Sequence, residues 1–312
     1  MIDAFALPTK HRDTETPRSS QSLGASVPRW PVAVRVAAIL MGLAFLPSSA
    51  VAQQRPLVTE DPETIGAGRV LIEGGLDYQR EVDYPASGLK GHLRRFPLIG
   101  ISLGIGSIGE VQIDGGLYNH LSITERRPAA LSHMLVVPGD STWHVEDMMV
   151  GTKVRLISEG VSRPAIALRS ATKLPMASNE SGLGLDTIDF YSSLIVGKTV
   201  QSVRLVGNIG LGILGDPTRG DKQNDVLTYG MSFARAISQR GEVVAEINGR
   251  KDTRLGDPPP GTESRSMLRF GGRYTVGALR ADAALMFGVT SNDPAVGVAA
   301  GFTYVFNIPQ AP

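Results

Sequence analysis

The chain contains no cysteine and carries almost no net charge, and both features narrow its function. Its 312 residues include 31 Lys and Arg against 30 Asp and Glu, which gives a formal net charge of +1. Without thiolates, a disulfide scaffold, a zinc-ribbon site and a cysteine nucleophile are excluded. A near-neutral chain also lacks the basic surface that neutralises nucleic-acid phosphates. We therefore expect no nucleic-acid partner. We also expect no cofactor and no metal, since the histidines form no His-x-x-x-His pair and no carboxylate cluster is evident.

Long apolar runs are also scarce, and the longest one indicates an export signal. Residues 31–46 are mostly apolar, and Ala50-Val51-Ala52 supplies the small-x-small pattern of a signal peptidase site. The uninterrupted run of about 11 residues from Val36 to Leu46 is short for a membrane helix, which needs about 20. We predict that residues 1–52 are a cleaved signal peptide. A cysteine-free exported protein fits the bacterial cell envelope.

From residue 68 onward, apolar and polar residues alternate with a period of two. In Val203–Leu214, Leu205, Ile209 and Leu211 share one face, and Arg204 and Asn208 lie on the other. A strand sorts such residues onto two faces, whereas a helix would scatter them. The pattern predicts twelve strands, at residues 68–80, 92–105, 110–118, 144–158, 163–174, 183–198, 203–214, 225–238, 242–252, 263–276, 279–290 and 295–307.

The predicted connections alternate between tight turns and longer loops. Tight turns are expected at 106–109, 159–162, 199–202, 239–241 and 277–278. Longer loops are expected at 81–91, 119–143, 175–182, 215–224 and 253–262, with a shorter one at 291–294. Outer-membrane barrels place short turns on the periplasmic side and long loops outside. We therefore predict an all-β fold, a closed antiparallel transmembrane β-barrel of about 12 strands over residues 68–307, with a tail at 308–312.

Strand parity also predicts which side chains face the barrel interior. The expected lumen-lining residues carry both signs of charge, and they are Glu73, Asp77, Asp114, Asp147, Lys153, Arg155, Arg169, Lys173, Asp189, Arg204, Glu246, Arg250, Arg269, Arg273 and Asp282. About twelve strands should enclose a narrow interior, because eight strands are filled by side chains and sixteen leave a water channel. These charges could order a solute along its path. They could equally form a salt-bridged core that closes the barrel.

Residues 53–67 precede the first predicted strand and carry Glu60, Asp61 and Glu63 together with two prolines. Such a segment is too polar and too interrupted to be a membrane-embedded helix. It begins on the periplasmic side, and its acidic residues could pair with arginines inside the barrel. We predict that it is a plug. The alternative is an unstructured linker left by signal cleavage.

Two stretches of the chain resemble a known family. The first is Pro-Leu-Val-Thr-Glu-Asp-Pro-Glu-Thr-Ile-Gly-Ala-Gly-Arg at residues 56–69, and the second is Lys173-Leu-Pro175 followed by Gly182, Gly184 and Asp189. They are similar to the putative outer-membrane transporters named for the meta-pathway of phenol degradation. The resemblance implies a barrel that passes small, often aromatic or apolar, compounds across the outer membrane. It implies no residue-level mechanism.

The sequence thus favours a monomeric outer-membrane barrel, in contact with membrane lipid, that mediates passive or facilitated passage of a small molecule. One alternative is a non-conducting structural or adhesive barrel, and another is a soluble exported β protein. An outer-membrane lipid hydrolase would need a serine with a histidine. His92, His120, His133 and His144 fall near the outer rim with serines nearby, but no spacing singles out a nucleophile. We therefore expect that the protein is not an enzyme.

Overall fold

The computed structural model describes residues 55–308. The predicted signal peptide, residues 53–54 and the end of the predicted tail at 309–312 lie outside this range. The described strands are β1 (Arg69–Tyr84), β2 (Leu89–Ile105), β3 (Gly109–Gly116), β4 (Asn119–Arg126), β5 (Ser141–His144), β6 (Met148–Ile157), β7 (Ala165–Leu174), β8 (Asp189–Val200), β9 (Val203–Gly215), β10 (Gln223–Ala236), β11 (Gly241–Asp252), β12 (Arg265–Val276), β13 (Leu279–Gly288) and β14 (Val296–Asn307). Two short 3-10 helices span Ser132–Met134 and Asn179–Ser181.

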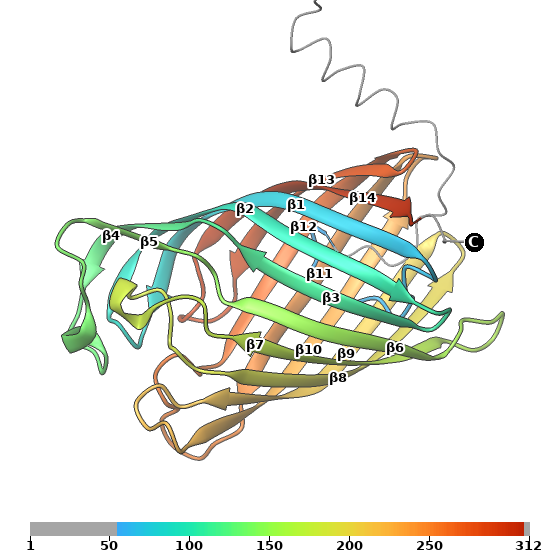
Figure 1. The fold of residues 1–312 in the computed structure, drawn as a ribbon. Coiled ribbons are helices and arrows are strands. Elements are labelled where there is room, and N and C mark those ends of the chain that lie inside the picture. Colours follow the sequence, from blue (N-terminus) through green and yellow to red (C-terminus); the bar gives the residue numbers. More distant parts are fainter. Residues whose placement is uncertain (1–54, 309–312) are drawn as a thin grey trace, which may run out of the picture. The chain divides into compact units, whose positions relative to one another are not determined.

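The sheet closes on itself. β1 pairs with its sequence neighbour β2 and also with β14, from Arg69 opposite Asn307 to Arg80 opposite Val296. All pairings are antiparallel, and Figure 1 shows the strands tilted around a common interior. A closed ladder leaves no unpaired edge, which is the condition for a sheet in hydrocarbon.

Two strands of the barrel wall are each interrupted once, so the fourteen described segments form a wall of twelve strands, as predicted. β3 and β4 both pair with β2, on either side of Leu117 and Tyr118. On the edge away from β2, β3 pairs with β6 and β4 pairs with β5. The breaks lie side by side, and a hydrogen bond of 2.8 Å from Glu146 N to Gly116 O joins them. β3–β4 and β5–β6 therefore act as two long, kinked strands.

The two ends of the barrel differ. Tight connections at 106–108, 201–202, 237–240 and 277–278 gather at one end, and the longer loops at 127–140, 175–188 and 253–264 lie at the other. The connection expected as a tight turn at 159–162 is longer than predicted and spans 158–164. In Figure 1 the β4–β5 hairpin extends past the wall at the long-loop end. We call the long-loop end the outer end. No helix among residues 55–308 is long and apolar enough to cross a membrane.

Three predictions at the outer end are wrong, and all three segments contribute to one hydrophobic cluster. Residues 119–143 were expected as a loop, but β4 and most of β5 lie within this range. Residues 81–91 were expected as a loop, but β1 and β2 continue as a hairpin that turns at residues 85–88. Strand six was expected to begin at residue 183, but β8 begins at Asp189. Buried Val82, Leu89, Leu93 and Leu121 form a cluster above the wall, and Leu183 packs against it. Burial in this cluster extends the hairpin and pulls residues 175–188 out of strand geometry.

The barrel is apolar outside and charged inside. Along β9, Leu205 and Ile209 are 42% and 57% exposed, and Met231 of β10 is 63% exposed. Inside, Lys153 is fully buried, with Glu110 and Gln112 nearly so. A water-soluble protein has the reverse distribution, so this surface suits a lipid environment.

Candidate functional site in the barrel interior

Residues 55–68, which we call the inner segment, lie within the barrel and contact strands around its circumference. At its start, Arg55 pairs with Asp282 of β13 at 3.6 Å and donates to Ala300 O of β14 at 3.0 Å. The backbone oxygen of Arg55 accepts a hydrogen bond of 2.7 Å from Arg273 of β12. Near its end, Ile65 N donates to Glu110 of β3 at 3.0 Å. Only a segment inside the ring of strands can reach both sides in this way.

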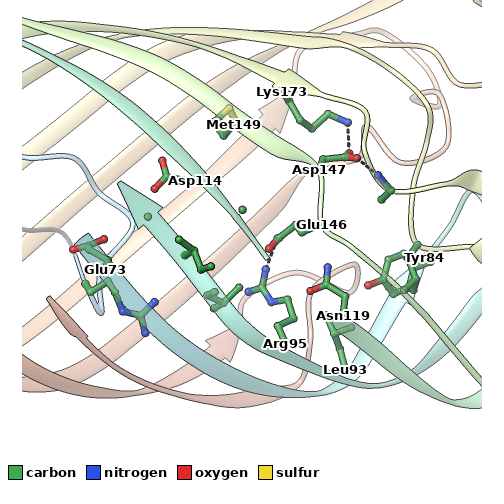
Figure 2. Close-up of a pocket in the computed structure, with 17 residues that line it drawn as sticks. Glu73, Tyr84, Leu93, Arg95, Asp114, Asn119, Glu146, Asp147, Met149 and Lys173 are labelled. Carbon is green, nitrogen blue, oxygen red and sulfur yellow. Dashed lines mark hydrogen bonds and ion pairs between the residues drawn. The ribbon is translucent and has the colours of Figure 1, made fainter. Parts of the chain in front are cut away.

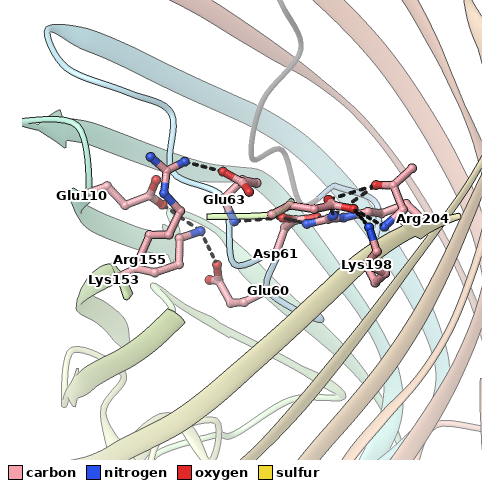
Figure 3. Close-up of polar contacts among 10 residues, drawn as sticks. Glu60, Asp61, Glu63, Glu110, Lys153, Arg155, Lys198 and Arg204 are labelled. Atoms are coloured by element: carbon pink, nitrogen blue, oxygen red, sulfur yellow. Dashed lines mark hydrogen bonds and ion pairs between the residues drawn. The ribbon is translucent and has the colours of Figure 1, made fainter. Parts of the chain in front are cut away.

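Glu60 anchors the inner segment in a buried charge cluster (Figure 3). Its carboxylate lies 3.1 Å from Lys153 Nζ and 2.9 Å from Arg169 Nε, and it accepts from Gln112 Nε2 at 3.2 Å. Lys153 also pairs with Glu110 at 3.1 Å. Burial opposes ionisation of Glu60, but the two cations outweigh it and lower the pKa of this carboxyl group. The cluster therefore keeps Glu60 charged without exposing it to bulk water.

The other two acidic residues of the inner segment pair with arginines of the wall. Asp61 binds Arg204 through two hydrogen bonds, of 2.9 Å to Nε and 2.7 Å to Nη2. Arg204 Nη1 also contacts Glu159, at 2.5 Å, in the turn that follows β6. Glu63 pairs with Arg155. Figure 3 shows these pairs aligned across the interior, so three successive acidic groups are matched by cations from β6, β7 and β9.

Glu246 of β11 binds the backbone of the inner segment. Its carboxylate accepts from Val58 N at 2.9 Å and 3.0 Å and from Thr59 N at 2.8 Å. Arg269 Nη1 balances the same carboxylate at 2.8 Å. Hydrogen bonds to an ionised acceptor are stronger than neutral ones, so this contact fixes the middle of the segment.

A second charged group lies toward the outer end (Figure 2). Arg95 of β2 reaches into the interior and pairs with Asp77, and it contacts Glu146 at 2.6 Å. Beside it, Lys173 bridges Asp147 at 2.9 Å and Asp189 at 3.2 Å. The interior therefore holds ion pairs at two levels, along the inner segment and toward the outer end.

Three cavities remain among these ion pairs. The outer cavity, of about 510 Å³, is lined by the 85–88 turn, Leu183 and Leu185 of the 175–188 loop, and Arg95. The inner cavity, of about 470 Å³, is lined by the inner segment, by strands β6 to β12, and by Gln79 and Arg95 of β1 and β2. A side cavity of about 450 Å³ reaches Glu73 and Asp114. Arg95 lines all three, so it stands where they meet.

None of the fifteen sequence-predicted lumen residues is exposed on the outer surface. Lys153, Arg155, Arg169, Arg204, Glu246, Arg273 and Asp282 contact the inner segment. Glu73, Asp114, Asp147, Lys173, Arg250 and Arg269 line cavities. Asp77 and Asp189 bind cavity-lining cations. Whether these residues form a solute path stays a prediction.

Sequence reasoning missed Arg55, Arg95, Glu110, Glu146 and Arg265 as interior residues. Arg95 was hidden because the outward face of β2 changes parity: Phe96 is 60% exposed and Ile101 is 42% exposed. A register shift against β1 between Gly75 and Asp77 accompanies this change. Phe96 and Ile101 both point outward from one strand, although one has an even number and the other an odd number. This mismatch is the signal that the alternation breaks between them.

The predicted rim histidines do not converge on a site. His92 lies 3.9 Å from Glu81, and His144 Nδ1 accepts from Ser178 N at 3.4 Å. Among residues 55–308, no three His, Asp or Glu side chains are grouped so that they could hold a metal ion.

Comparison with solved structures identifies similar barrels. The COG4313 outer membrane channel from Pseudomonas putida F1 matches with a TM-score of 0.57 and 10% identity, over 79% of this chain and 98% of that chain. At this identity the likeness shows a shared fold. The NanC porin follows with a TM-score of 0.46, 10% identity and coverage of 76% and 98%. A mutant of the TodX monoaromatic hydrocarbon channel gives 0.40, 11% identity and coverage of 79% and 93%. No protein-family model and no curated protein matches the sequence.

Proposed function

We propose that the protein is an outer-membrane channel for a small molecule, and that the inner segment controls its aperture. The observation that carries this proposal is the combination of an apolar outer surface with an interior that holds charged side chains and open cavities. A purely structural barrel of this width has no need of cavities of about 470 Å³. Cavities of this size accommodate small ligands.

The outer surface supports a position in the bilayer. Exposed apolar side chains cover the middle of the strands, including Leu205, Ile209 and Met231. Aromatic pairs lie near both ends of the wall, with Tyr118 and Trp143 at 5.4 Å and Tyr304 and Phe306 at 6.0 Å between ring centroids. Aromatic residues gather at the two interfaces of membrane barrels.

The inner segment is the obstacle to passage. It occupies the interior beside the inner cavity and is held by buried ion pairs to β6, β7 and β9. A solute that crosses the barrel must pass it, so we infer that the segment shifts during transport. Segments held mainly by polar contacts in a hydrated interior can move without unfolding the wall.

The first test is solute flux. Purified protein in proteoliposomes should admit small solutes faster than protein-free vesicles, as measured by swelling. The non-conducting structural barrel predicts equal rates in the two preparations. Equal rates with protein that is inserted and folded would therefore reject the channel.

A disulfide lock tests the role of the inner segment. A Cβ atom at Gly230 of β10 would lie 3.5 Å from Thr59 Cβ, within the range of about 3.5–4.5 Å for a disulfide. The native chain has no cysteine to interfere. Oxidised Thr59→Cys/Gly230→Cys should reduce flux, and reductant should restore it. The single variant Thr59→Cys should show no redox response. Equal flux in the oxidised and reduced double variant would show that movement of the segment is not required.

A further inference from the structure

Two arginines stand directly opposite each other on the interior face at the outer end. Arg250 of β11 and Arg265 of β12 are register partners. Facing residues on neighbouring strands place their Cβ atoms about 4.5–5.5 Å apart, and like charges in that position are destabilising. The interior therefore keeps two cations together at this place.

Neither arginine has a carboxylate partner. Within residues 55–308, no Asp or Glu oxygen lies within 4.0 Å of either guanidinium. Arg250 donates to the backbone oxygens of Glu263 and Gly261, at 2.9 Å and 2.6 Å. Arg265 donates to Asp83 O at 2.9 Å. Arg250 also hydrogen-bonds the side chain of Tyr191. These contacts position the two side chains, but neither guanidinium forms a direct ion pair.

The nearby carboxylates make their direct contacts with other groups, although Glu263 Oε2 has no hydrogen-bond partner and both Glu263 and Asp293 act on Arg265 through space. Asp83 pairs with Arg127. Glu263 accepts from Gly261 N at 2.8 Å, and Asp293 accepts from Ser266 N at 2.9 Å. Asp147 pairs with Lys173.

The arginine pair lies between two cavities. The outer and inner cavities share four lining residues, which are Gln79, Arg95, Arg250 and Arg265. Three of the four are arginines, and Arg95 is the one that acidic groups neutralise. Any molecule that moves from the outer to the inner cavity therefore passes these two guanidinium groups, neither of which forms a direct ion pair.

The inner cavity offers a different surface to the rest of such a molecule. Met149, Met267, Tyr191 and Tyr229 line it beside polar groups. Thioether and aromatic side chains make favourable contacts with a flat apolar ring.

We propose that Arg250 and Arg265 bind the carboxylate of a small organic anion whose apolar body enters the inner cavity. The planar guanidinium presents paired donors that match the two oxygens of a carboxylate. The anion would also relieve the repulsion between the two cations. This assignment rests on the proposed channel function for its role in passage, but binding can be measured without flux.

The test is equilibrium binding to the folded protein in detergent at low ionic strength, because salt screens such contacts. Benzoate is the probe, and benzyl alcohol is a neutral compound with the same aromatic ring. Calorimetry should show that benzoate binds more tightly than benzyl alcohol. Arg250→Gln/Arg265→Gln should weaken benzoate binding by about tenfold or more, as expected for loss of charge-assisted hydrogen bonds.

Two further variants keep the result interpretable. Arg254→Gln removes an exposed arginine from the same loop region and should leave benzoate affinity unchanged. Arg250→Lys/Arg265→Lys keeps both positive charges but loses the paired N–H donors of the guanidinium groups. Its affinity for benzoate should therefore fall between those of the wild type and the glutamine variant. Equal affinity for benzoate and benzyl alcohol, or wild-type affinity in the glutamine variant, would overturn the assignment. Benzoate binding without solute flux would instead reject the channel and leave the anion site standing.

Discussion

Single interior residues decide how firmly the inner segment is held. Glu246 is the clearest case, because one buried carboxylate accepts both backbone N–H groups of Val58 and Thr59. Its own charge is balanced by Arg269, so the contact does not leave an unpaired ion in the interior. Removing the charge on Glu246 should therefore loosen the segment while the wall stays intact.

We predict that Glu246→Gln increases amide hydrogen exchange of the inner segment by about tenfold, the loss expected for a charge-assisted hydrogen bond. Exchange mass spectrometry of peptides covering residues 55–68 measures this change. Glu263→Gln is the matched control, since that carboxylate binds Gly261 N in an outer loop. Unaltered protection in Glu246→Gln would mean that other contacts hold the segment.

The alternation of the sequence predicted which residues face the interior, but not which residues they contact there. Alternation placed Lys153 and Arg204 inside because both lie in regular strands. It missed Arg95, where the strand changes parity next to Pro97. No local pattern could reveal that Lys153 is shared between Glu60 and Glu110, because those contacts join residues far apart in the chain.

Individual strands follow their local alternation wherever the two faces meet different environments. β8 illustrates this, since Leu194 is 42% exposed and faces Leu168 and Ile209 on its two neighbours. Next to it, Ser193 lines the inner cavity. The boundaries failed most at the outer end, where Leu183 and Leu89 pack in a cluster that alternation does not encode.

This pair of adjacent residues gives a test of the two faces. We predict that Leu194→Arg destabilises the folded barrel by about 2–4 kcal/mol, the cost of a cation near the bilayer midplane. Ser193→Arg should cost much less, because its side chain enters a hydrated cavity. Urea unfolding in lipid vesicles measures both. A similar loss of stability in the two variants would contradict the assignment of the lipid-facing side.

The whole molecule combines a closed wall with an interior obstacle. Closure between β1 and β14 pairs the backbone of the wall without a contribution from the inner segment. The strand count and the segregation of the loops were predictable, because both depend on local alternation and turn residues. The placement of the inner segment was a hypothesis from three acidic residues, and only the fold shows which cations meet them.

The most direct test of the account is the single-channel conductance of a variant that lacks residues 55–65. We predict a higher conductance than that of the wild type, because the obstacle is gone while the wall remains. A variant in which a Gly-Ser chain of equal length replaces these residues should also conduct more, since it keeps the length but loses the ion pairs of Glu60, Asp61 and Glu63. Unchanged conductance in both variants, with normal folding and insertion, would contradict the account.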